Sequence, residues 1–187
     1  MEACPSQTVG PFFSFGLTAG DLGRMAREGA AGKRIWLVIR VLDGDGLPVP
    51  DAMIELWQAD ANGKYPHPED RQEKTADPAF SNFGRMGTDE SGTCAFETVR
   101  PGAVPAPGAG LQAPHINVHV FARGILWHLM TRIYFAGDPD NHEDPILNLV
   151  PFDRRETLFA SPDNDEPDTW NFDIYLAGAY ETVFFEA

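Results

Sequence analysis

Two histidines and an asparagine alternate with aliphatic residues at His115, Asn117 and His119, and such a pattern raises the question of a metal site. The alternation predicts a β-strand over residues 115–121, with the three polar side chains on one face. On a strand the two histidines lie roughly 13 Å apart, too far to share an ion, and the amide between them is a poor ligand for a transition metal. We interpret them as hydrogen-bonded strand histidines. A metal site within this chain is the alternative.

Arg123 and Tyr65 are two further candidates for chemistry, and each has a plain alternative. Arg123 lies in the turn Ala122–Gly124, where its guanidinium could hold a carboxylate through two hydrogen bonds or could simply be an exposed cation. Tyr65 could be a phenolate metal ligand or an ordinary loop aromatic, and taken alone it favours the second. The sequence contains no nucleophile elbow, phosphate-binding glycine loop or dinucleotide fingerprint.

The elements that must position these residues are short strands separated by turns, which predicts one all-β domain over residues 1–187. We expect an antiparallel β-sandwich with long loops, including a polar loop at 59–82, and little helix beyond a short one around Asp21–Glu28. The expected strands are Arg34–Leu42, Met53–Gln58, Cys94–Val99, His115–Phe121, Ile125–Phe135, Glu156–Ala160, Trp170–Leu176 and Thr182–Phe185.

Composition narrows the class of protein. The chain has 187 residues, 43% of them hydrophobic, which is enough to form a core without disulfide bonds or structural metal ions. A net charge of −14 opposes binding to nucleic acid or anionic lipid. The two cysteines, Cys4 and Cys94, form no disulfide framework, and no signal or membrane-spanning pattern is seen, so we expect a cytoplasmic protein.

The N-terminal segment carries aromatic side chains that a frayed terminus rarely has, namely Phe12, Phe13 and Phe15. We expect this arm, about residues 1–30, to dock on a surface, either this chain's own sheet or a partner chain.

Several motifs together resemble intradiol ring-cleavage dioxygenases. They are Val49–Ala52 with Glu55–Tyr65, Thr98–Gly102, Ala113–Asn117 and Thr131–Phe135. The segments Pro5–Phe12 and Glu181–Phe185 match more narrowly, to the non-catalytic alpha chain of members built from two homologous chains. The resemblance covers nearly the whole chain and implies a β-sandwich of the intradiol type.

The same resemblance implies that this chain has lost the family's iron site. Catalytic chains hold ferric iron, Fe(III), with two tyrosines and two histidines. Tyr65 and His115 match two of these positions, whereas Val104 and Asn117 occupy the other two. We therefore expect no metal ligands and no catalytic residues in this chain, with Fe(III) held by a homologous beta chain in a higher αβ oligomer.

The resemblance also assigns substrate-binding residues at the partner's pocket: Thr8, Gly10, Pro11 and Arg123. The expected reaction is cleavage of a carboxylate-bearing catechol by O₂. Two other interpretations stay open, a non-catalytic β-sandwich binding module and an iron enzyme in its own right with unusual ligands.

Overall fold

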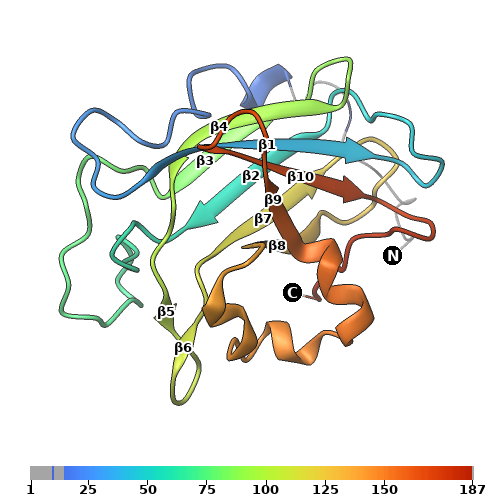
Figure 1. The fold of residues 1–187 in the computed structure, drawn as a ribbon. Coiled ribbons are helices and arrows are strands. Elements are labelled where there is room, and N and C mark those ends of the chain that lie inside the picture. Colours follow the sequence, from blue (N-terminus) through green and yellow to red (C-terminus); the bar gives the residue numbers. More distant parts are fainter. Residues whose placement is uncertain (1–9, 11–14, 187) are drawn as a thin grey trace, which may run out of the picture.

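The computed structural model describes residue 10 and residues 15–186, which form one eight-stranded sheet and a small hairpin (Figure 1). The strands are β1 (Arg34–Leu42), β2 (Met53–Gln58), β3 (Phe83–Gly87), β4 (Thr93–Val99), β5 (Val104–Pro105), β6 (Leu111–Gln112), β7 (His115–Phe121), β8 (Leu129–Phe135), β9 (Phe159–Pro162) and β10 (Thr169–Tyr175). Three short 3₁₀ helices, η1 (Pro139–His142), η2 (Leu147–Leu149) and η3 (Phe152–Leu158), connect β8 to β9.

The large sheet is mixed and nearly closed, which corrects the expected antiparallel sandwich. Its strand order is β3-β2-β7-β8-β9-β10-β1-β4. β1 is parallel to β10 and β8 is parallel to β9, while the other neighbours are antiparallel. The two end strands of this order, β3 and β4, contact each other without pairing. The all-β class with little helix is confirmed.

An N-terminal segment, residues 22–26, fills the seam between β3 and β4. Met25 N–H donates to the carbonyl of Glu97 in β4 (2.8 Å), and Arg85 N–H in β3 donates to the carbonyl of Leu22 (3.2 Å). Gly84 lacks a side chain where a Cβ would lie 2.7 Å from the sulfur of Met25, so the segment packs tightly. The helix predicted around Asp21–Glu28 is therefore wrong, because this backbone bonds to the two strand edges instead.

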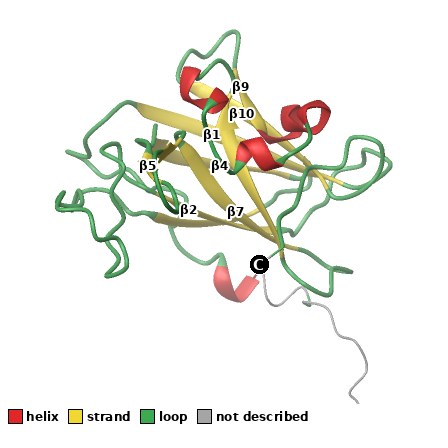
Figure 2. Cartoon of the chain, turned by 90° about the horizontal axis from the view of Figure 1, so that it is seen from below, coloured by secondary structure: helices red, strands yellow, loops and turns green. Residues whose placement is uncertain are grey.

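The core lies inside the curved sheet, where alternate side chains of the strands meet. Ile35, Leu37, Ile39 and Val41 of β1 are fully buried against the aliphatic face of β7. Figure 2 shows the strands of the large sheet enclosing this interior, with the helices outside them. The aliphatic face of residues 115–121 is thus the core face, as the alternation predicts.

Most of the predicted strands are present, and the differences lie in the short unpredicted strands β3, β5 and β6, at the start of β8 and near the C-terminal end. β1, β2 and β7 have the predicted bounds, and β4 and β10 each begin one residue earlier than predicted. β8 begins at Leu129 rather than Ile125, and β3 was not predicted. The strand predicted at 156–160 is present only in part, because η3 runs to Leu158 and β9 spans Phe159–Pro162. The strand predicted at 182–185 is also wrong: its one ladder contact is the bridge between Met130 and Phe185.

Candidate functional site

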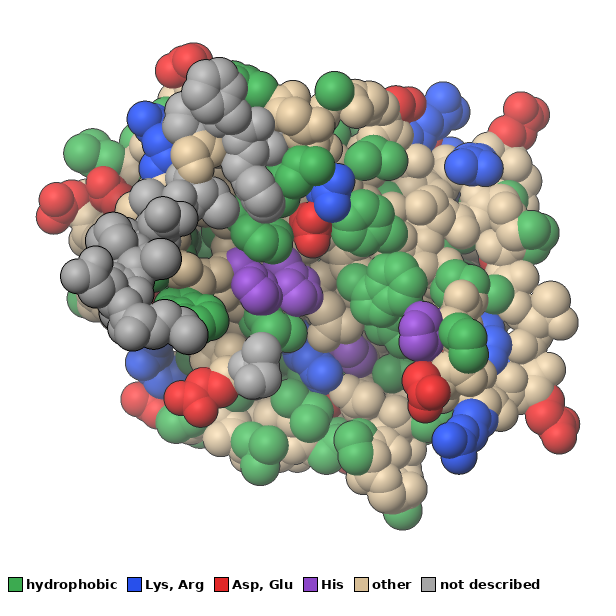
Figure 3. Space-filling view, turned by 180° about the vertical axis from the view of Figure 1, so that it is seen from behind, with side chains coloured by type: hydrophobic (Ala, Val, Ile, Leu, Met, Phe, Trp, Pro, Cys, Tyr) green, Lys and Arg blue, Asp and Glu red, His purple; other side chains and the backbone are tan. Residues whose placement is uncertain are grey.

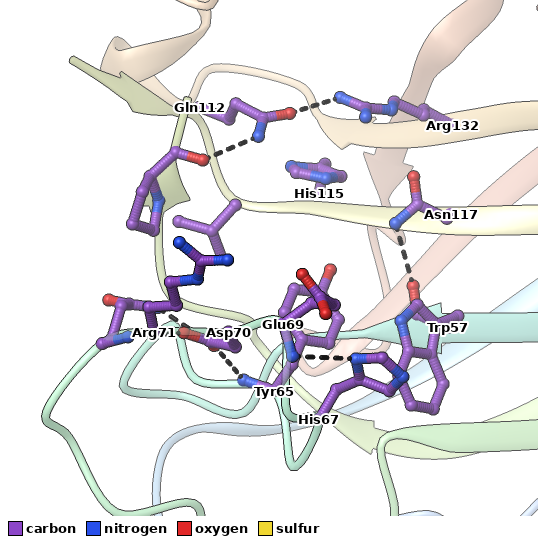
Figure 4. Close-up of a pocket in the computed structure, with 13 residues that line it drawn as sticks. Trp57, Tyr65, His67, Glu69, Asp70, Arg71, Gln112, His115, Asn117 and Arg132 are labelled. Atoms are coloured by element: carbon purple, nitrogen blue, oxygen red, sulfur yellow. Dashed lines mark hydrogen bonds between the residues drawn. The ribbon is translucent and has the colours of Figure 1, made fainter. Parts of the chain in front are cut away.

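A cavity of about 710 Å³ opens at the start of β7, and we call it the β7 cavity. It is lined by Trp57, Tyr65, His67, Glu69, Asp70, Arg71, Gln72, Val104, Pro105, Gln112, His115, Asn117 and Arg132. Figure 4 shows His115, Asn117 and Arg132 on the strand side of the cavity, facing the loop that carries Tyr65 and Arg71. The four positions that the family resemblance assigns to iron ligands therefore meet in one place.

Tyr65 is placed by a loop held together by two aspartates. Asp60 is buried and accepts hydrogen bonds from three backbone N–H groups, among them that of Lys64 (3.0 Å). Asp70 accepts from the backbone N–H of Tyr65 (2.8 Å) and pairs with the Lys64 ammonium (3.1 Å). Burial by itself raises the pKa of Asp70, but the backbone donors and Lys64 outweigh it and lower that pKa to about 2. The loop thus presents Tyr65 on an ordered frame.

The hydroxyl of Tyr65 is a neutral phenol in this setting. Burial raises the pKa of Tyr65 to about 12, although the positive charge of Arg132 and a hydrogen bond with the Asn117 side chain act in the opposite direction. Its ring stacks on Trp57, with centroids 5.6 Å apart and planes 18° from parallel. The pair makes a flat aromatic wall.

His115 is neutral and its proton position is fixed by a backbone carbonyl. Its Nδ1 lies 2.7 Å from the carbonyl oxygen of Ala113, which can only accept, so Nδ1 carries the hydrogen and Nε2 is left as an acceptor. Burial, followed by the charge of Arg132, lowers the pKa of His115 to about 4. The prediction of a hydrogen-bonded strand histidine is confirmed for this residue.

His119 has a different environment, although it lies on the same strand. It does not line the β7 cavity but stacks on His128, with ring centroids 5.2 Å apart, and burial lowers its pKa. Figure 3, which views the molecule from behind, shows histidine side chains in contact among hydrophobic ones on this face.

Arg123 lies outside the β7 cavity, in the connection between β7 and β8 at the far end of β7 from His115. Its Nε is 2.9 Å from Oδ2 of Asp51, and its side chain remains 59% exposed. The structure therefore does not bring Arg123 beside His115 and Asn117. Gly10 is exposed, and Thr8 and Pro11 lie outside the described residues.

Arg132, Gln112 and Trp57 are cavity residues that the sequence reasoning did not single out. The strand pairing carries a signal for two of them: Trp57 and Arg132 stand opposite Asn117 on its two sides, in β2 and β8. Arg132 Nη1 donates to Oε1 of Gln112 (2.8 Å). Side chains in register on adjacent strands share a face, so the face of Asn117 predicts these neighbours once the pairing is known.

Comparison with known proteins identifies the family. Residues 9–178 match the family model described as Dioxygenase. Over its whole length the chain is 41% identical to the protocatechuate 3,4-dioxygenase alpha chain of Burkholderia cepacia, of which it covers 98%. The chain belongs to the intradiol ring-cleavage dioxygenase family.

The other matches agree with this family. Across 79% of the chain, the sequence is 37% identical to the protocatechuate 3,4-dioxygenase beta chain of Burkholderia cepacia, of which 66% is covered. The solved structure of catechol 1,2-dioxygenase from Acinetobacter sp. ADP1, inhibited by bound mercury, superposes with a TM-score of 0.61. That match has 27% identity and covers 81% of this chain and 55% of that one. The family predicted from the motifs is confirmed.

Intradiol dioxygenases are iron enzymes, but the donors in the β7 cavity do not fit ferric iron. Val104 offers no donor atom, Asn117 offers an amide, and the guanidinium of Arg132 lines the same space. Tyr65 and His115 alone cannot supply four protein ligands, and a cation beside them opposes a trivalent ion. In the described part of the chain, no group of three or more histidine, cysteine, aspartate or glutamate side chains could hold a metal.

None of the described helices is long and apolar enough to span a membrane.

Proposed function

We propose that this chain is the alpha subunit of a protocatechuate 3,4-dioxygenase and completes the active-site pocket of a homologous beta chain. The complex converts protocatechuate and O₂ into 3-carboxy-cis,cis-muconate, a step of aromatic catabolism in the beta-ketoadipate pathway, and acts in the cytoplasm. One observation carries the proposal: whole-length identity of 41% to such an alpha chain. The donor set of the β7 cavity agrees with it, because a chain that has lost its iron ligands needs a partner that keeps them.

In this proposal Fe(III) is bound by the beta chain, and this chain contributes contacts around it. Arg123 would favour the anionic substrate through its guanidinium, which matters in a chain whose net charge is −14. Thr8, Gly10 and Pro11 of the N-terminal arm would shape the aromatic slot. These four assignments rest on the family resemblance.

The surface around Arg123 suits contact with a partner. In the loop that follows it, Leu126 is 56% and Trp127 is 81% exposed, so two neighbouring apolar side chains are open to contact with another surface. Within the predicted docking arm, about residues 1–30, residues 22–26 hydrogen-bond to this chain's own sheet, which is one of the two surfaces expected for it. Docking of the preceding residues on a beta chain remains a proposal.

The test is reconstitution with the beta chain. We expect the co-purified pair to contain iron and to consume O₂ with protocatechuate, and the beta chain alone to be much less active. The isolated alpha chain should have neither iron nor activity. Equal O₂ uptake by the beta chain with and without the alpha chain would contradict the proposal and would favour a separate binding module.

A further inference from the structure

The guanidinium of Arg132 lines the β7 cavity without a carboxylate to pair with. Its hydrogen bonds are to neutral groups, Oε1 of Gln112 at 2.8 Å and the hydroxyl of Tyr134 at 3.5 Å. No carboxylate of a described residue forms an ion pair with it, whereas six other arginines of the described chain do have such a partner: Arg24, Arg34, Arg40, Arg85, Arg100 and Arg123.

A second cavity of similar size contains an arginine whose charge is neutralised by a carboxylate of this chain. It has a volume of about 670 Å³ and contains Arg40, which binds Asp173 through two hydrogen bonds, at 3.0 and 2.6 Å. There the positive charge is already satisfied by this chain. In the β7 cavity it is not, so Arg132 can accept an anion from outside.

The acidic groups of the β7 cavity do not compete for Arg132. Asp70 is held by Lys64 and by the backbone N–H groups of Tyr65 and Gln72. Glu69 is exposed on the loop beside the cationic Arg71. Figure 4 shows these loop residues across the cavity from Arg132. Arg132 therefore supplies the positive charge on the strand side of the cavity, and Arg71 supplies another on the loop side.

The remaining walls suit a flat ring with a hydroxyl group. The stacked rings of Trp57 and Tyr65 offer an aromatic surface, and Val104 and Pro105 add apolar area. Nε2 of His115 is an acceptor, as the Nδ1 contact requires, and accepts no hydrogen bond from the described residues. A phenolic O–H could donate to it. A volume of about 710 Å³ is ample for one benzene ring with small substituents.

We infer that the β7 cavity is a metal-free binding site for a small aromatic carboxylate, with the carboxylate on Arg132 and the ring against Trp57 and Tyr65. The inference rests on the charge and shape of this cavity. It does not depend on the proposed catalytic role of the complex, since the residues involved belong to this chain alone.

The experiment measures binding to the complex of this chain with its beta chain. The probe is labelled benzoate, whose single carboxylate lacks the adjacent hydroxyls of a catechol, and the neutral comparison is benzamide. Equilibrium dialysis should show saturable benzoate binding of about one per alpha chain, in addition to any at the pocket of the beta chain, together with quenching of fluorescence that is lost in Trp57→Phe. Arg132→Met should weaken benzoate binding at least about tenfold and leave benzamide binding unchanged. Arg132→Lys should fall between, because it keeps the charge but loses the planar fork.

Arg40→Met is the matched control, since it removes the same charge from a cavity of similar size, and it should bind benzoate like the wild type. Val104→Phe narrows the β7 cavity without removing the guanidinium of Arg132 and should abolish binding, which provides a second test if Arg132→Met fails to assemble. No saturable binding, equal weakening by Arg40→Met and Arg132→Met, or normal binding by Val104→Phe would each overturn the inference. Protocatechuate turnover measured on the same preparations keeps the two proposals apart: turnover without benzoate binding rejects only the cavity site, and binding without turnover rejects only the catalytic role.

Discussion

Asn117 and Arg132 stand directly opposite each other on the neighbouring strands β7 and β8, and both side chains line the same cavity. An amide and a guanidinium therefore share one cavity with the phenol of Tyr65 and the imidazole of His115, at positions where the family resemblance implies a second histidine and ferric iron in catalytic chains. The change is one of charge as well as of ligands. The guanidinium of Arg132 places a fixed positive charge in the cavity where a catalytic chain would bind a metal cation.

The first prediction concerns iron in the assembled complex. Tyr65→Phe should leave the iron content and the visible absorption of the complex unchanged, because the proposed function assigns the iron ligands to the beta chain. Metal analysis per αβ pair and an absorption spectrum check it. Loss of iron or of colour in Tyr65→Phe would show that the β7 cavity holds metal, and the donor argument from Val104 and Asn117 would fail.

Gly63 offers a test of how the Tyr65 loop is fixed. Its φ is +75°, and a Cβ there would lie 2.0 Å from the carbonyl oxygen of Ala103. Gly63→Ala should thus lower the free energy of unfolding by more than about 2 kcal/mol, combining left-handed strain with a collision.

Gly137 is the matched control for Gly63, because its φ is +78° and a Cβ there would meet nothing within 4 Å. Gly137→Ala should cost only the left-handed strain, about 1–2 kcal/mol. Denaturant unfolding of both variants separates the two contributions. Equal losses would mean that the loop yields to the extra methyl group.

The stability of the same loop should depend on pH through Asp70. Its pKa is lowered to about 2 from the value of 3.8 for an aspartate without such partners. A folded-state pKa below the unfolded one contributes stability that is present above about pH 4 and is lost as the pH falls toward 2. Asp70→Asn should accordingly be less stable than wild type at pH 7, with the difference shrinking between pH 4 and pH 3. A difference independent of pH in urea unfolding would remove the carboxylate from the explanation.

The sequence predicted the strands on which the site is built, and it failed where structure depends on distant partners. The alternation in residues 34–42 and 115–121 fixes which face is buried, so both strands were predicted with their observed bounds. Met25 could not be placed this way, because its segment is extended only through bonds to two strands far along the chain. The near-closure of the sheet and its mixed topology cannot be predicted for the same reason, because they depend on pairing between strands that are far apart in the sequence.

Within the candidate site, the sequence identifies the side chains that lie in family motifs. It misses the side chains that are brought into the site by the pairing of neighbouring strands. Tyr65, Val104, His115 and Asn117 were named from the family pattern, and they meet in the β7 cavity. Arg132 lies in a strand whose partner and register the sequence does not specify. Arg132 lines the cavity because it stands opposite Asn117 in the paired strand, and this pairing is a feature of the tertiary structure.

The last prediction concerns Arg123, which the family resemblance places at the partner's pocket. Arg123→Ala should lower kcat/KM of the complex for protocatechuate by roughly 1–3 kcal/mol, the range for a hydrogen bond to a charged group, and should affect an uncarboxylated catechol much less. Because Arg123 also pairs with Asp51, the control is Asp51→Asn, which removes that ion pair and tolerates the φ of +60° at this position. If Arg123 acts on the substrate carboxylate, Asp51→Asn should retain most of the protocatechuate activity, since it leaves the guanidinium free. Steady-state O₂ uptake with both substrates decides the matter: equal losses for both, or an Asp51→Asn variant as impaired as Arg123→Ala, would assign the arginine to holding the β7–β8 connection in place.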